Sequence, residues 1–121
     1  MTTQETRKAV ELYFAAWTRN DPDAARAQLA DDLVFVGPSA RYESADAFYP
    51  ALKGFAAITK SARIAELLVD GDRAAMLYDC ELPPPAGVTR IASFFRVANG
   101  KIAWYETLFD PTEFRKLAPK K

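Results

Sequence analysis

Residues 62–109 decide the fold, and they read ARIAELLVDGDRAAMLYDCELPPPAGVTRIASFFRVANGKIAWYETLF. Turn residues divide this stretch at Asp70-Gly71-Asp72, at 83–87 (PPPAG) and at Asn99-Gly100. Asp-Gly and Asn-Gly favour hairpin turns because these residues tolerate a positive φ. The pattern predicts an antiparallel meander of four strands, at 62–69, 73–82, 88–97 and 101–109.

A long amphipathic helix is predicted at the N-terminus. Thr2 and Glu5 have the spacing of a capping box, which begins a helix. The next residues place an apolar stripe at helical intervals, formed by Val10, Tyr13, Phe14 and Trp17. The stripe gives the helix one side suited to a hydrophobic core.

Three shorter elements are predicted between this helix and the meander. Asp21-Pro22 is an N-cap followed by proline in the first turn, so a second helix begins there and ends near Ala30. A brief strand follows at 33–36. Ser44 caps a third helix, which Pro50 should kink or shorten.

Length and composition predict one domain that spans residues 1–121. Of the 121 residues, 50% are hydrophobic and 26% are charged, as in ordinary globular proteins. Helices followed by an antiparallel sheet indicate an α+β fold with the helices on one face. After Asp110-Pro111, a short helical turn is expected.

The chain contains no histidine and one cysteine. The lack of histidine excludes Ser–His–Asp and Cys–His activation and imidazole ligands for metals. We therefore expect neither a metal nor a cofactor. Any acid–base chemistry must use carboxylates, tyrosines, lysines or Cys80, and Cys80 has no histidine to activate it.

The charge pattern predicts that the protein does not bind nucleic acid. Sixteen basic and sixteen acidic residues balance, and the basic ones are scattered along the chain. No apolar run approaches the roughly 20 residues of a membrane span. The polar start MTTQE is unlike a signal peptide, and one cysteine cannot form an internal disulfide. We expect a cytoplasmic protein without membrane contact.

Short strings spread over nearly the whole chain match a known family. They are Tyr13-Phe14-Ala15-Ala16-Trp17, Asn20-Asp21-Pro22-Asp23, Leu29-Ala30-Asp31-Asp32, 70–75 (DGDRAA), Phe94-Phe95-Arg96-Val97, Gly100-Lys101-Ile102 and Leu108-Phe109-Asp110-Pro111. With them the chain resembles the SnoaL-like branch of the nuclear transport factor 2-like superfamily. The resemblance implies a cone with an internal apolar pocket, made by a curved antiparallel sheet wrapped around the long N-terminal helix.

The resemblance implies two classes of function. One is a cofactor-free isomerase, cyclase or hydrolase that acts on a small apolar substrate. The other is a non-catalytic module for hydrophobic-ligand binding or dimerisation, because the fold alone does not assign function. Against the ketosteroid isomerases, Tyr13 matches the oxyanion-binding tyrosine and Tyr49 a supporting one. The general base is replaced by Gly37 and the second acid by Ser93.

The catalytic set of limonene epoxide hydrolase is also replaced, by Cys80, Leu82 and Thr107. Asp79 and Glu81 remain as candidate acid–base residues, because two carboxylates on one face of a strand would raise one pKa in a poorly solvated pocket. Comparison with ketosteroid isomerase places them inward. The alternating apolar set Met76, Tyr78, Cys80 and Leu82 instead places both acids in water, and both interpretations stay open.

The remaining candidate residues would line such a pocket. Tyr13 would donate to a ligand oxyanion. The predicted ligand contacts are aromatic and hydroxyl side chains, namely Trp17, Phe35, Tyr49, Ser93, Phe95, Tyr105 and Thr107. The alternative is that the aromatic residues only build the core.

The last strand has apolar residues on both faces. Ile102, Trp104 and Leu108 alternate with Ala103, Tyr105, Thr107 and Phe109. Helices can cover one face of the sheet. The other face then exposes a patch that contains Phe94, Trp104 and Leu108. Such a patch predicts a homodimer through the outer face of the sheet.

Overall fold

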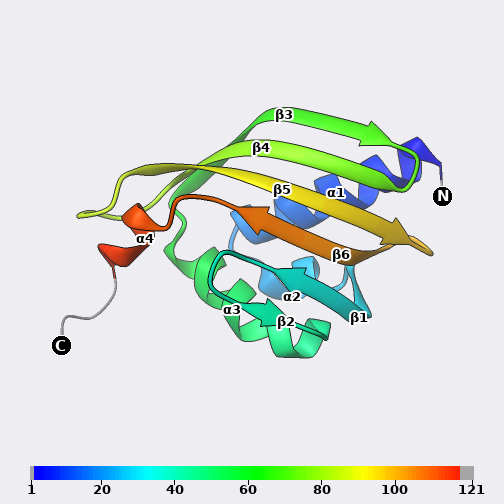
Figure 1. Cartoon of the computed structure of the whole chain (residues 1–121), viewed down its shortest axis with the longest axis horizontal. Helices are drawn as coiled ribbons and strands as arrows, with labels where there is room; N and C mark the ends of the chain where they lie inside the picture. The colour runs from blue at the N-terminus through cyan, green and yellow to red at the C-terminus, as the bar shows by residue number, and fades with distance from the viewer. Residues whose placement is uncertain (1, 118–121) are drawn as a thin grey trace.

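The computed structural model describes residues 2–117. The elements are α1 (Thr3–Thr18), α2 (Pro22–Arg26), β1 (Leu29–Val36), β2 (Arg41–Tyr42), α3 (Ala45–Ile58), β3 (Ser61–Asp70), β4 (Arg73–Glu81), β5 (Val88–Ala98), β6 (Lys101–Leu108) and α4 (Thr112–Arg115). The six strands form one sheet in the order β2-β1-β6-β5-β4-β3. Figure 1 shows these strands as a long curved layer with the helices below and behind it. The α+β fold class predicted from the sequence is confirmed.

The predicted antiparallel meander is present from β3 to β6. Its two tight turns contain Gly71, Asn99 and Gly100 with φ of 61°, 53° and 79°, the left-handed conformations that Gly and Asn tolerate. β1 extends the sheet by pairing in parallel with β6, and β2 pairs antiparallel with β1. The sheet is therefore antiparallel except for one parallel pair.

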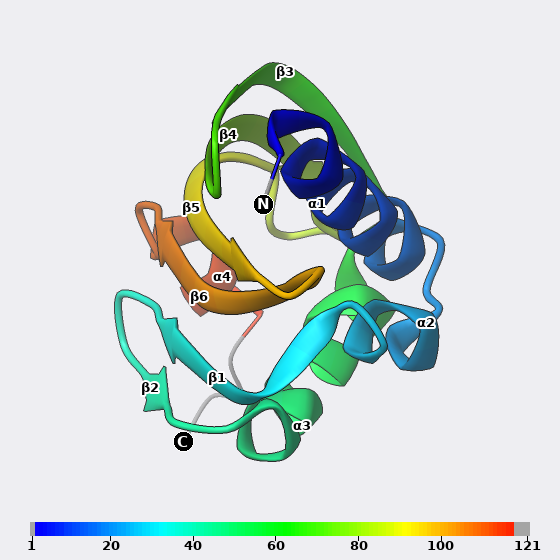
Figure 2. The same ribbon diagram turned by 90° about the vertical axis from the view of Figure 1, so that its right-hand side faces the viewer.

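Helix α1 lies within the curve of the sheet, as Figure 2 shows. The predicted capping box is present, since the Thr2 side chain accepts from Glu5 N–H and the Glu5 side chain accepts from Thr2 N–H. The predicted apolar stripe faces inward, and Val10 and Tyr13 are 0% and 1% exposed. Its aromatic rings thus form one side of the interior.

Two predicted element boundaries in the first half were wrong. β1 begins at Leu29 rather than at residue 33, and α2 ends at Arg26. Leu29 is buried and pairs with Ile102 of β6. This pairing with a distant strand overrides the local preference of Asp31 and Asp32 for a turn. Helix α3 also runs through Pro50 without shortening there.

An irregularity in β6 corrects the predicted pattern of its faces. The register passes from Arg96 opposite Trp104 to Val97 opposite Ile102, which leaves Ala103 as an extra residue. A bulge of this kind reverses the alternation of side chains. Ile102 is consequently fully buried in the core rather than on the outer face.

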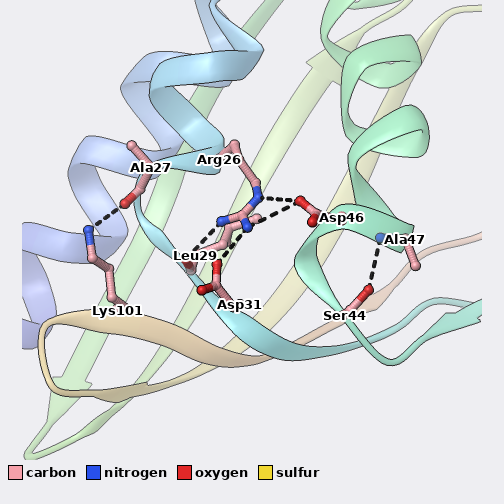
Figure 3. A network of polar contacts seen from close by, with 8 residues as sticks. All are labelled: Arg26, Ala27, Leu29, Asp31, Ser44, Asp46, Ala47 and Lys101. Atoms are coloured by element: carbon pink, nitrogen blue, oxygen red, sulfur yellow. Dashed lines mark hydrogen bonds and ion pairs between the residues drawn. The ribbon is translucent and has the colours of Figure 1, made fainter.

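Arg26 joins three neighbouring elements (Figure 3). Its guanidinium donates to Asp31 of β1 at 2.7 Å, to Asp46 of α3 at 3.2 Å and to the Leu29 carbonyl at 3.2 Å. Both carboxylates are largely exposed to solvent. The network fixes the turn between α2 and β1 against the start of α3.

Between residues 2 and 117, no helix has the length and apolar character needed to span a membrane.

Candidate functional site

A cavity of about 200 Å³ lies between the concave face of the sheet and helices α1 and α3. Most of its wall is aromatic or aliphatic. Trp17 packs edge-on to Phe55 with ring centroids 4.9 Å apart, and Phe35 stacks on Phe48 at 4.3 Å. These ring contacts hold the wall in a fixed shape.

Three tyrosines from different elements meet in the wall of this cavity. Tyr13 comes from α1, Tyr78 from β4 and Tyr105 from β6, and all three are buried. Tyr13 and Tyr105 pack edge-on at 5.3 Å. Helical spacing turns Tyr13 toward the sheet, and strand alternation turns Tyr78 inward, which is why they converge.

The environment keeps these phenols neutral. Burial raises the pKa of Tyr13 and of Tyr78 well above the usual tyrosine value. Burial also raises the pKa of Tyr105, although side-chain hydrogen bonds with Tyr13, Thr107, Tyr78 and Ser93 oppose that rise. A neutral phenol has one O–H donor. The cavity wall therefore carries uncharged phenol hydroxyls that hydrogen-bond to one another, and a ligand acceptor would take the place of one of these bonds.

The cavity opens beside the loop that joins β1 to β2. Pro38, Ser39 and Ala40 of this loop are exposed and also line the cavity. The loop is closed by a hydrogen bond from Gly37 N–H to the Ala40 carbonyl, 2.8 Å long. A Cβ on Gly37 would lie 3.0 Å from the ring of Phe35, so glycine at this position leaves room for the ring.

Sequence comparison places the chain in a known family. The SnoaL-like domain family matches residues 10–105. The chain belongs to the SnoaL-like family. No curated protein matches it.

Solved structures similar to this SnoaL-like chain share its fold. A protein from Kribbella flavida DSM 17836 is 29% identical, with a TM-score of 0.85 and coverage of 89% of this chain and 88% of that one. A proposed polyketide cyclase from Sinorhizobium meliloti is 25% identical, with a TM-score of 0.75 and coverage of 88% and 99%. An LEH-like epoxide hydrolase from M. tuberculosis is 23% identical, with a TM-score of 0.78 and coverage of 94% and 92%. At that identity the likeness shows the fold alone.

The structure places part of the predicted site in the cavity wall of this SnoaL-like domain. The residues found there are Tyr13, Trp17, Phe35, Tyr105 and Thr107. Ser93, Phe95 and Tyr49 do not reach the wall, which corrects their predicted role as ligand contacts. Ser93 and Phe95 instead support it, because the Ser93 hydroxyl lies 3.1 Å from that of Thr107 and Phe95 stacks on Tyr105 at 4.8 Å. Tyr49 donates to Asp23 at the surface.

Asp79 and Glu81 lie on the outer face of the sheet, so the interpretation that they line the pocket was wrong. Tyr78 faces the cavity, and strand alternation turns both of its acidic neighbours away. Asp79 accepts two hydrogen bonds from Arg90, at 2.9 and 3.0 Å, which hold the pKa of Asp79 below its usual value. Glu81 accepts from the Ser61 hydroxyl at 3.0 Å.

Sequence reasoning missed three polar wall residues, Ser39, Tyr42 and Tyr78, of which only Tyr78 is fully buried. The signal for Tyr78 was present, because Tyr78 belongs to the alternating apolar set of β4 that faces inward. Phe48 and Leu52 of α3 were likewise missed as wall residues. Their spacing shows a buried helix face but not that a cavity lies beside it.

The wall contains no Asp, Glu, Lys, Arg or Cys among the residues that the structure describes. Nor do residues 2–117 bring three His, Cys, Asp or Glu side chains together in a way that could hold a metal ion. The SnoaL-like cavity can therefore exclude water, orient an apolar ligand and donate hydrogen bonds to it. It does not offer a carboxylate as a general base.

Proposed function

We propose that the protein binds a small, largely apolar molecule that carries one hydrogen-bond acceptor, such as a ketone oxygen. The observation that carries this proposal is the convergence of Tyr13, Tyr78 and Tyr105 in a largely apolar cavity. Apolar walls with a few placed polar groups are typical of sites for small molecules. A neutral acceptor fits because the wall supplies donors without a countercharge.

The size of the cavity favours a ligand with one ring. A cavity of about 150 Å³ in another protein binds benzene, and this one measures about 200 Å³. An aromatic ketone with one ring therefore matches its volume. The ring would pack against Trp17 and Phe35, and the oxygen would point toward the tyrosines.

Acetophenone and α-methylstyrene form a matched pair for a binding test. They have nearly the same shape, but only acetophenone has a carbonyl oxygen. We expect calorimetry to show acetophenone binding more tightly by roughly threefold to tenfold, the worth of one neutral hydrogen bond. Tyr13→Phe and Tyr78→Phe should each reduce this difference, whereas Tyr49→Phe, which lies outside the cavity, should preserve it.

Two results would reject the binding proposal. One is that neither compound binds at millimolar concentration, and the other is that benzoate binds better than acetophenone. The second result would mean that the site recognises an anion. Denaturation curves for each variant would show that any loss of affinity occurs in folded protein.

A second candidate function is catalysis on the same class of ligand, with Tyr13 as the oxyanion donor. It is favoured by the buried phenols, because fixed donors in a dry site stabilise a developing enolate oxygen. It is also favoured by the likeness to a proposed polyketide cyclase. Enolisation would pass the α-proton of the ketone to solvent water at the mouth of the cavity, beside the β1–β2 loop, since no carboxylate lines the described cavity wall.

Proton exchange separates the two candidates. In deuterated water, catalysis predicts that the protein accelerates exchange of the methyl protons of acetophenone, measured by NMR, and that Tyr13→Phe slows this exchange. Binding alone predicts the rate of buffer for both proteins.

A further inference from the structure

The C-terminal turn α4 packs against the cavity wall from outside. The ring of Phe114 lies 5.5 Å from that of Phe55 and 4.8 Å from that of Phe109, centroid to centroid. Both of these rings line the cavity, whereas Phe114 does not. Phe114 therefore supports two wall residues that come from different parts of the fold.

Polar contacts hold α4 in this place. The Glu113 carboxylate accepts the Gly87 N–H at 2.8 Å and forms an ion pair with Lys116 at 2.9 Å. Gly87 belongs to the loop between β4 and β5, so the bond joins α4 to the neighbouring hairpin loop at the same end of the sheet (Figure 1). At its start, the Asp110 side chain accepts from the Thr112 N–H at 3.0 Å.

The wall near α4 contains two partly buried rings, Phe55 and Phe109. By contrast, Tyr13, Tyr78 and Tyr105 are buried. A partly buried ring can turn away from the cavity if the side chain that packs on its outer side is removed, because that side of the ring then contacts only solvent. Among the described residues, Phe114 is the aromatic neighbour of Phe109, whereas Phe55 packs against Trp17 as well.

We propose that Phe114 determines the upper size of the ligand by holding Phe55 and Phe109 in the cavity wall. The inference rests on the proposed function, since it concerns the ligand of the same cavity. Phe114 acts as a positioning residue, because it touches the wall and not the cavity. With Phe114 in place the site accepts one ring, and without it the wall yields to a second, fused ring.

A pair of ketones that differ by one fused ring tests this proposal. Calorimetry would give the Kd of acetophenone and of 2-acetylnaphthalene for the wild type and for Phe114→Ala. The wild type should prefer acetophenone. In the variant the ratio of the two affinities should shift toward 2-acetylnaphthalene by about tenfold, because the second ring can then be buried.

Controls separate this role from a general loss of structure. Phe94→Ala removes the same ring from the outer face of the sheet and should leave the ratio unchanged. Phe114→Leu keeps an apolar contact without a ring, so it should shift the ratio in the same direction but less. If Phe114→Ala does not fold, Phe114→Leu and Glu113→Ala, which removes the bond to Gly87, decide the result.

Each outcome bears on one proposal in a distinct way. Equal ratios in the wild type, Phe114→Ala and Phe114→Leu would overturn the size role while leaving ketone binding intact. Failure of the wild type to bind acetophenone would overturn the proposed function and the size role with it. A shift that also occurs in Phe94→Ala would assign the effect to general loosening and overturn the role of Phe114.

Discussion

Tyr78 and Asp79 are neighbours in β4 and have opposite environments. Tyr78 is 2% exposed and lines the cavity, whereas Asp79 pairs with Arg90 on the outer face. Side chains alternate along a strand, so a shift of one residue in register would exchange a phenol for a carboxylate in the cavity. The register of this strand thus gives the cavity a neutral donor and excludes a charged base.

Replacing Asp79 should change stability and not ligand binding. Arg90 lowers the pKa of Asp79, so the carboxylate adds stability above its unfolded pKa of about 3.9 and loses it as the pH falls through the lower folded value. Urea midpoints of the wild type and Asp79→Asn should therefore differ near neutral pH and converge in acid. A gap that stays constant with pH, or weaker binding of acetophenone, would contradict this assignment.

Cys80 should be inert in the folded protein. Burial raises the pKa of Cys80 to about 12, and its side chain is fully buried. At about pH 8 only about one thiol in ten thousand is then ionised, and the thiolate is the reactive form. We expect Ellman's reagent to label the unfolded chain at once and the native chain only as fast as it opens. Rapid labelling of native protein would show that the thiol is accessible.

At the scale of elements, local signals predicted the meander well. Asp70-Gly71 and Asn99-Gly100 specify hairpin turns by themselves, so β3 to β6 could be placed to within about a residue. The start of β1 depends on pairing with β6, and the bulge at Ala103 depends on how β5 and β6 fit together. Neither depends on a local pattern, which is why both predictions failed.

The residues of the candidate site likewise fall into those that a local pattern predicts and those that depend on packing between distant elements. Tyr13 and Trp17 were predictable because the stripe of α1 must face a core. The meeting of these residues with Phe55 and Phe109 depends on the packing of α3 and of the segment after β6. The orientation of Asp79 and Glu81 could be read from the alternation in β4, but the comparison with another family member pointed the other way.

β1 should be held by Leu33 more than by the charges around Arg26. Leu33 is 0% exposed, so Leu33→Ala should lower the free energy of unfolding by about 2–5 kcal/mol. The carboxylates that pair with Arg26 are exposed, so Arg26→Met should cost less than about 1 kcal/mol. Leu12→Ala, at a side chain 45% exposed, is the matched control and should have little effect. The reverse order in urea denaturation would mean that the ion pairs hold this strand.

At the scale of the whole molecule, the outer face of the sheet carries an uncovered apolar surface. Leu68 and Leu108 are 67% and 61% exposed, and they border a shallow groove that also contains Leu77 and Phe94. Ala75 and Ala92 in the groove have small side chains, so a second flat surface could approach it closely. Large exposed patches of this kind are typical of protein interfaces.

We propose that a second copy of the chain covers this face, through Phe94, Trp104 and Leu108. Charge supports a two-fold contact. Arg96 lies over the rings of Phe94 and Trp104, within 6.0 and 5.8 Å of their centroids, while Glu106 borders the groove opposite Phe94. A two-fold axis would allow the arginine of each copy to face the glutamate of the other.

Introducing a charge at the centre of this face should separate the copies. We expect the wild type to have twice the 13.4 kDa mass of the chain by light scattering, and Leu108→Glu and Trp104→Glu to have the mass of one chain. A buried, unpaired carboxylate costs more than an apolar interface gains at that position. Leu12→Glu places the same charge at an exposed position of α1 and should leave the mass unchanged. A monomeric wild type, or variants that stay dimeric, would remove this face as the contact. Because Leu108 and Trp104 do not line the cavity, binding of acetophenone by the separated copies would further show that each chain holds a complete site.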